Sequence, residues 1–285
     1  MIALASRNIK LFFRDKAMVF FSLLSVFIII GLYVLFLGNV WTSEFPNQEY
    51  AKFIMNSWIM AGLISVTGFT TAVGAFGIMI QDRELNIEKD FLSAPVKRSS
   101  LAAGYLLSAY GISVIMSLIA FILGEIFILA EGGELLGIVA IFKIIGIILI
   151  NSFMSVSIIQ VIIGFIHTGN AFSAFSTIVG TLIGFLTGIY LPIGQLPTGV
   201  QTLIRIFPVS HSASLARQIF MDVPLKIGFN GVPEAAVNGF KELMGVTFFV
   251  GSKEITPWMS LCYMLLIGAL FFAIAVMNLS KRKLE

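Results

Sequence analysis

Six apolar stretches, each long enough to cross a lipid bilayer, divide this 285-residue chain. A hydrocarbon core about 30 Å thick is crossed by a helix of about 20 apolar residues. The predicted spans are Ala17–Leu37, Phe53–Ile80, Leu101–Leu129, Ile138–Ile166, Phe172–Leu191 and Trp258–Leu279. Hydrophobic residues make up 58% of the chain and charged residues 12%, against about 25% charged residues in an average protein. We therefore predict an all-α integral membrane protein with six transmembrane helices.

The segments between the predicted spans carry unequal positive charge. The N-terminus, residues 81–100 and the C-terminus together hold 11 Lys and Arg residues, whereas the longer segments on the other side hold 6. Segments rich in Lys and Arg stay in the cytoplasm. We expect a multi-pass protein of the cell membrane with both termini cytoplasmic. The net charge of +3 is small, and we expect no nucleic-acid partner.

Residues 1–16 predict an amphipathic interfacial helix ahead of a six-span transmembrane domain, residues 17–285. Apolar side chains recur at helical spacing on one face, and basic side chains fall on the other: Ile2, Ala5, Ile9, Phe12 and Phe13 against Arg7, Lys10 and Arg14. A basic amphipathic helix of this kind lies at the anionic inner surface of a membrane. Membrane lipid is therefore an expected partner.

Residues 81–100 form the most charged stretch of the chain, with apolar Phe91 and Leu92 in its middle. One interpretation is an ordinary solvated connector. The other is a short docking helix that exposes Phe91 and Leu92 as an anchor. Charge alone favours the connector.

Residues 192–257 are too long for a plain loop. The sequence predicts three short amphipathic helices here, over residues 198–207, 212–221 and 233–244. Thr198 and Gln201 fit a capping box for the first helix, and Pro208 is expected to stop it. These helices would dip into the outer leaflet or cap a cavity, and the alternative is a small structured external domain.

Small residues recur at four-residue spacing in the fifth predicted span, at Ser176, Gly180, Gly184 and Gly188. Such a stripe lets two helices approach closely, because packing rather than hydrophobic burial drives helix association in lipid. The contact could lie within one subunit or between two subunits. We predict the second.

Two ionisable residues, Glu125 and Lys143, fall inside the predicted spans. Both would lie near the outer boundary, where they could offset the cost of insertion by pairing. The alternative is that Lys143 snorkels to the outer headgroups and Glu125 faces a wet cavity.

Catalytic and nucleotide-binding motifs are missing from the sequence. No G-x-x-x-x-G-K-[ST] loop occurs, and neither H-E-x-x-H nor G-x-S-x-G is found. The single cysteine, Cys262, cannot form an internal disulfide, and no Cys/His cluster offers a metal site. We therefore expect neither an enzyme nor a bound cofactor.

Two segments, in their order and spacing, resemble type-2 ABC-transporter permeases. The first resembles that family's first cytoplasmic loop, through Asp82, Arg83, Glu84, Phe91, Leu92, Pro95, Lys97 and Arg98. The second resembles the family's signature after span five, through Gly188, Pro192, Leu196, Pro197, Phe207, Pro208 and Arg217. The family often has Gly-Thr where this chain has Leu85-Asn86, which weakens the mapping of the loop.

The resemblance implies a permease subunit that pairs with a second permease, identical or different, and with two ABC ATPase subunits. The loop at residues 81–98 would be the coupling helix, and ATP and Mg would be bound by the partner. The residues after span five would gate the exit of an exported substrate. We expect an amphipathic drug, lipid-like toxin or peptide. A lipid-linked glycan, an ATP-independent secondary carrier and a non-transporting sensor or scaffold remain as alternatives.

Overall fold

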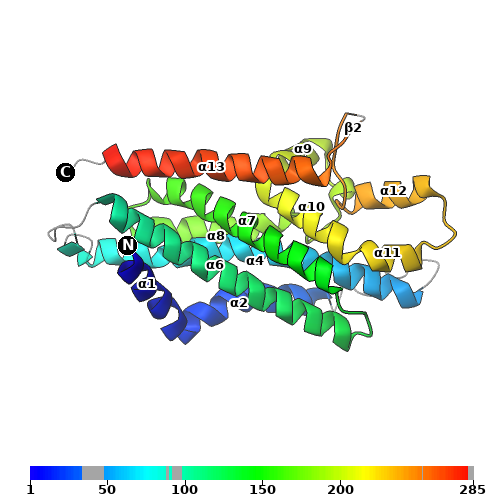
Figure 1. The fold of residues 1–285 in the computed structure, drawn as a ribbon, viewed down its shortest axis with the longest axis horizontal. Coiled ribbons are helices and arrows are strands. Elements are labelled where there is room, and N and C mark those ends of the chain that lie inside the picture. Colours follow the sequence, from blue (N-terminus) through cyan, green and yellow to red (C-terminus); the bar gives the residue numbers. More distant parts are fainter. Residues whose placement is uncertain (34–47, 88–89, 92–97, 252, 282–285) are drawn as a thin grey trace.

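Long helices lie side by side along one axis of the computed structural model, which describes residues 1–33, 48–87, 90–91, 98–251 and 253–281 (Figure 1). Within that part of the chain, five helices are long and apolar enough to cross a membrane. They are α4 (Gln48–Glu84), α6 (Arg98–Ala130), α7 (Ile138–Ile163), α8 (Gly169–Leu186) and α13 (Pro257–Lys281). The prediction of a helical, multi-pass membrane protein is confirmed.

The first predicted span corresponds to α2 (Lys16–Leu32), which is shorter than the other five. It begins at Asp15, whose carboxylate accepts a hydrogen bond from the backbone N–H of Met18 at 3.0 Å and so caps the helix. Residues 34–37 of the predicted span lie outside the described residues. Six full spans therefore stay a prediction.

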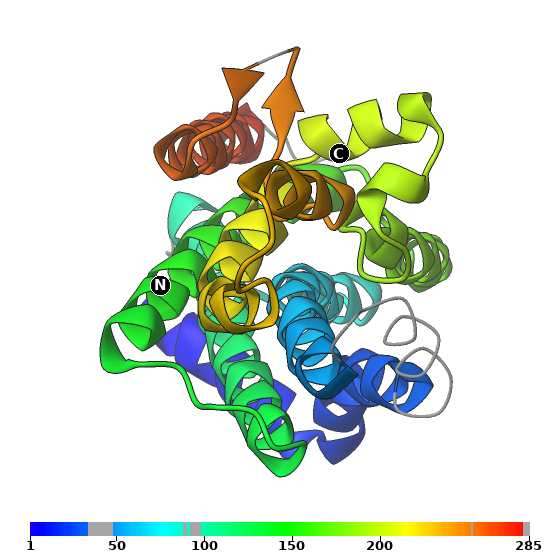
Figure 2. The same ribbon diagram turned by 90° about the vertical axis from the view of Figure 1, so that its right-hand side faces the viewer.

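Helix α4 occupies the centre of the bundle, as an end-on view shows (Figure 2). It contacts α2, α6, α7, α8 and α10. Among the candidate spans α4 is the most buried and α8 the least. The α4 helix is longer than the predicted span Phe53–Ile80, because it continues into polar residues at both ends.

The N-terminal helix α1 (Ile2–Arg14) forms as predicted. Ala5 and Phe12 of the predicted apolar face are buried, together with Asn8, and α1 packs on α6. Ile9 and Phe13 of that face are half-buried, whereas Ile2, the first residue of the helix, is 73% exposed. The predicted apolar face is therefore the one that packs within the bundle, apart from its first residue.

The segment after α8 folds into short elements at the end of the bundle away from the N-terminus (Figure 1). These are η2 (Ile193–Gln195), α9 (Thr198–Ile206), α10 (Pro208–Phe220), α11 (Asp222–Gly228), α12 (Glu234–Leu243), β1 (Phe249–Val250) and β2 (Lys253–Glu254). The two strands pair antiparallel.

Three expectations for this segment were wrong in detail. The second short helix, α10, begins at Pro208 rather than at residue 212, which suits the missing N–H of proline, and Pro208 also stops α9 as predicted. Thr198 makes no capping bond, since Pro197 is the N-cap of α9. Helix α10 does not lie on the outer surface: it packs between α4, α7 and α13, and most of its residues are buried.

Candidate functional site

The last turn of α4 carries three consecutive charged residues, and each one holds a different neighbour. Arg7 of α1 donates two hydrogen bonds to the Asp82 carboxylate, at 2.6 and 2.9 Å. The Tyr105 hydroxyl of α6 donates a third, at 2.6 Å. Asp82 is almost fully buried, and its hydrogen bonds raise the pKa of the Arg7 guanidinium. Asp82 therefore ties α4 to both α1 and α6.

Arg83 and Glu84 extend this arrangement to the next two helices. Arg83 donates to the backbone carbonyls of Ile163 and Ile166, at 3.1 and 2.9 Å, where α7 ends. The Glu84 carboxylate accepts the backbone N–H of Gly169, the first residue of α8. A cation at a helix C-terminus and an anion at an N-terminus are both favourable placements.

The helical geometry explains why three adjacent residues reach three different places. Side chains of consecutive residues in an α-helix point about 100° apart. Asp82, Arg83 and Glu84 therefore fan out around the end of α4. The predicted charged connector is in this part an ordered junction of α1, α4, α6, α7 and α8. We call Asp82, Arg83 and Glu84, with Arg7 and Tyr105, the charged junction.

The turn that follows α4 contains Asn86, which has a φ of 58°. Glycine is the usual choice in this left-handed region, and asparagine is among the few other residues that enter it readily. The turn after α4 therefore uses an asparagine in a backbone conformation that glycine usually adopts.

Phe91 differs from its prediction as an exposed anchor. Its ring is half-buried, and the Arg7 guanidinium lies over it at 5.5 Å from the ring centre. This cation–π contact links the segment after α4 to the same arginine that holds Asp82. Leu92, Pro95 and Lys97 lie outside the described residues. Arg98 is the first residue of α6, and its side chain also lies outside them.

At the opposite end of the bundle, Arg217 of α10 is completely buried. It donates to the carbonyls of Thr187 and Gly188, both at 3.0 Å, and more weakly to that of Gly245 at 3.4 Å. Its guanidinium lies 4.8 Å from the ring centre of Trp58 in α4. No ion pair to Arg217 is found within the described ranges. Burial lowers its pKa to about 9, so it remains charged at neutral pH.

The six residues predicted as an outer gate do not form one cluster. Leu196 packs with Ile193, Ile204 and Phe248 in a small separate core. Phe207 instead makes an edge contact with Phe69 of α4, at 5.8 Å between ring centres. Pro192 is buried, Pro197 is exposed and Pro208 begins α10. Of the set, Arg217 joins the most distant segments.

The glycine stripe of α8 divides into two parts. A Cβ added at Gly184 would collide with the ring of Tyr190 in the same chain, whereas one added at Gly180 would meet nothing within 4 Å. Helix α8 ends at Leu186, so Gly188 lies beyond it with a φ of 64°. Ser176 is half-buried and its hydroxyl has no hydrogen-bond partner. The close approach at Gly184 is thus within the subunit.

The predicted pair of Glu125 and Lys143 is not formed. Glu125 accepts the backbone N–H of Leu136 at 3.0 Å and so holds the connection that follows α6. Lys143 is exposed, and no ion pair joins these two described residues. The backbone N–H of Leu136 takes the place of Lys143 as the partner of Glu125. The exposed Lys143 side chain can instead extend to the lipid headgroups.

A buried cluster of uncharged polar residues joins the helices inside the bundle. The sequence did not predict it, because only ionisable groups stand out within apolar spans. The hydroxyls of Ser65 and Ser212 lie 2.8 Å apart, and Asn151 donates to the carbonyl of Ser65 at 3.1 Å. Ser113 donates to Ser152 at 3.0 Å. These bonds join α4, α6, α7 and α10. The polar run in α7, from Asn151 onward, was the available signal.

One family model matches this chain, and it describes the ABC-2 type transporter over residues 1–221. No curated protein matches the sequence. The match covers more than half of the chain, from α1 to the end of α10, and includes both segments on which the resemblance rested. Members of this family form the membrane transport domain of ABC transporters and work with an ATPase subunit. The chain therefore belongs to the ABC-2 type transporter family.

Proposed function

We propose that this chain is the permease subunit of an ABC exporter that takes its energy from ATP hydrolysed by a separate ATPase subunit. The ATPase docks at residues 81–98, and an amphipathic substrate leaves on the side of α9 to α12. The observation that carries this proposal is the charged junction. Its three consecutive charges connect the docking segment to α1, α6, α7 and α8.

The junction suggests how movement at the ATPase reaches the spans. A displacement of the segment after Glu84 acts on α4 directly. Through Asp82 it acts on Arg7 and Tyr105, and through Arg83 and Glu84 it acts on the turn between α7 and α8. Because the ion pair between Arg7 and Asp82 is bidentate and the Asp82 carboxylate is buried, the pair resists separation of α1 from α4. The helices at this end would then move as a unit.

Pairing with a second permease, identical or different, is part of the proposal. Helix α8 is the least buried candidate span, and Gly180 on it has open space around an added Cβ. A second subunit would cover this face, with the substrate path between the two. The Lys and Arg residues near the junction support placing this end of the bundle on the cytoplasmic side of the cell membrane.

Co-purification with a candidate ABC ATPase tests the proposal, followed by transport and ATP hydrolysis in vesicles. The informative variant is Asp82→Asn, which keeps the shape of the side chain and removes its charge. It should leave the ATPase bound but abolish the stimulation of hydrolysis by transported compounds. The matched control is Asp222→Asn, because Asp222 makes an exposed i,i+4 pair with Lys226 at the other end of the bundle.

Docking itself is tested by changing Phe91 and Leu92 to Asp together. This variant should release the ATPase while the permease stays inserted and elutes as a single peak. The proposal fails if no ABC ATPase binds the wild-type permease. The role of the junction fails if Asp82→Asn transports as well as Asp222→Asn.

A further inference from the structure

Helix α12 lies at the end of the bundle opposite the charged junction, and a cleft lies between it and α11 (Figure 1). Residues of α10, β2 and the first turn of α13 complete the lining. The most buried side chains of the lining are Leu225 of α11 and Val246, which form an apolar floor. The volume of about 420 Å³ falls within the range of about 300–1,000 Å³ that is usual for small-molecule sites. We call this space the α12 cleft.

Helix α12 covers this cleft as a weakly packed lid. None of its ten residues, all of which the structure describes, is buried. It contacts η2, and the ring centres of Phe240 on α12 and Phe229 lie 5.0 Å apart. Gly231 before the helix and Gly245 after it have positive φ values of 80° and 65°, which glycine adopts without strain. A helix with so little buried surface, between two such turns, can open at small free-energy cost.

Charged side chains of both signs surround the cleft. Asp222 and Lys226 of α11 pair with each other at 2.8 Å. Lys241 of α12 and Glu254 of β2 have no ion-pair partner within the described residues. Two groups of opposite charge therefore remain available on two walls of a cleft with an apolar floor. A ligand with a single charge would satisfy one of them, whereas a zwitterion can pair with both.

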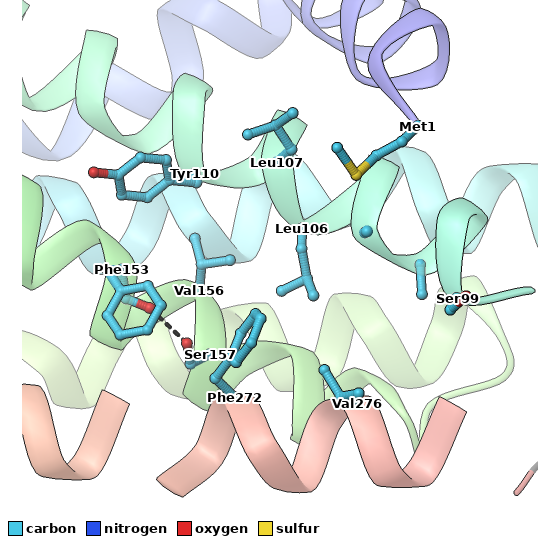
Figure 3. Close-up of a pocket in the computed structure, with 12 residues that line it drawn as sticks. Met1, Ser99, Leu106, Leu107, Tyr110, Phe153, Val156, Ser157, Phe272 and Val276 are labelled. Atoms are coloured by element: carbon cyan, nitrogen blue, oxygen red, sulfur yellow. Dashed lines mark hydrogen bonds between the residues drawn. The ribbon is translucent and has the colours of Figure 1, made fainter. Parts of the chain in front are cut away.

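The position of the cleft along the bundle indicates where its ligand comes from. Pro257 of the lining is the first residue of α13, a candidate membrane span. The adjacent Trp258 is 76% exposed, and exposed tryptophan at a span end is typical of the headgroup level. The groove between α6 and α13 differs, because apolar side chains such as Leu106 and Phe272 line it (Figure 3). None of the described residues that line that groove has a charged side chain.

We propose that the α12 cleft binds the headgroup of a zwitterionic phospholipid from the leaflet on the side of α12. The phosphate pairs with Lys241, and the ammonium group pairs with Glu254. The upper part of one acyl chain crosses the apolar floor of Leu225 and Val246 and leaves the cleft past Pro257 toward the bilayer. Helix α12 moves aside to admit the lipid and then closes over it.

The test uses native mass spectrometry of the permease in dodecyl maltoside, with equal amounts of phosphatidylethanolamine and phosphatidylglycerol that carry the same acyl chains. The wild type should retain more phosphatidylethanolamine. Lys241→Gln and Glu254→Gln should each lower this preference about threefold, the effect of one exposed ion pair. Glu242→Gln and Lys253→Gln are the matched controls, because these exposed neighbours do not line the cleft. Amide hydrogen exchange of residues 231–245 should also slow when phosphatidylethanolamine is added.

A second pair of variants tests the space itself. Val237→Trp fills the cleft from α12 and should remove the preference, whereas Ala235→Trp, on an exposed residue of α12 outside the lining, should keep it. Neither residue is buried, so both variants should fold. Equal retention of the two lipids by the wild type, or a preference that survives Val237→Trp, would overturn the proposal. Displacement of the lipid by a transported compound would assign the cleft to substrate instead. No ATPase is needed, so a negative result here leaves the proposed function untouched.

Discussion

Arg217→Lys should destabilise the permease markedly, although the positive charge is kept. In the wild type, Nη2 of Arg217 donates to two carbonyls at 3.0 Å. A hydrogen bond from a charged group contributes about 1.5–3 kcal/mol, and a lysine in this place can keep roughly one of the two. The cation–π contact of Arg217 with Trp58 is also weakened, and such a contact contributes about 2 kcal/mol when it is buried. Together these losses amount to about 2–4 kcal/mol.

Thermal unfolding in detergent, followed by the loss of the monodisperse elution peak, measures this effect. At roughly 2–4 °C per kcal/mol, the unfolding temperature should fall by on the order of 5–10 °C. The control is Arg205→Lys, since half-buried Arg205 bonds to Gln201 within its own helix at 3.3 Å. If both lysine variants unfold at the wild-type temperature, the carbonyl contacts of Arg217 contribute little and the reasoning is wrong.

Three further changes test other parts of the structure. Gly169→Ala places a methyl group 2.7 Å from Glu84, and should reduce substrate-stimulated ATP hydrolysis severalfold without loss of ATPase binding. Gly184→Ala collides with the ring of Tyr190, and should lower the unfolding temperature of the single subunit by several degrees. Burial lowers the pKa of His211 from its ordinary value. As the pH falls through that ordinary value, the unfolded chain therefore binds more protons than the folded chain. Stability should therefore fall between about pH 7.5 and about pH 5.5, and His211→Gln should lessen the fall in unfolding temperature.

The two glycine predictions have matched controls within the chain. A methyl group added at Gly199 or Gly180 meets nothing within 4 Å. Gly199→Ala should leave coupling unchanged, and Gly180→Ala should leave the unfolding temperature unchanged. If Gly184→Ala instead lowers only the fraction of paired permeases, the close contact lies between subunits after all.

The spans could be predicted from the sequence because hydropathy records the length of a helix inside hydrocarbon. Hydropathy does not record where a helix continues outside it. The extension of α4 to Glu84 therefore turned an expected loop into an ordered junction. The partners of Asp82 are Arg7 and Tyr105, and Arg7 lies 75 residues away along the chain. Neither partner can be identified from the sequence around Asp82.

Helix α10 shows a second limit. Its sequence is rich in serine and contains Arg217 and His211, so amphipathic reasoning placed it on the surface. Its actual environment is set by polar groups on other helices. Ser65 of α4 bonds to Ser212 of α10. The carbonyls of Thr187 and Gly188, which follow α8, accept hydrogen bonds from Arg217, so both α10 side chains are buried with partners. A pattern within 13 residues cannot reveal such partners.

The central place of α4 constrains how the protein can be made. Ser65 of α4 finds its partner Ser212 only 147 residues later in the chain. At about 5–20 residues per second, the ribosome needs roughly 7–30 s to produce that stretch. Throughout this interval the Ser65 hydroxyl lacks the partner on α10 that it has in the finished fold. The polar contact between α4 and α10 is thus completed only late in the synthesis of the chain.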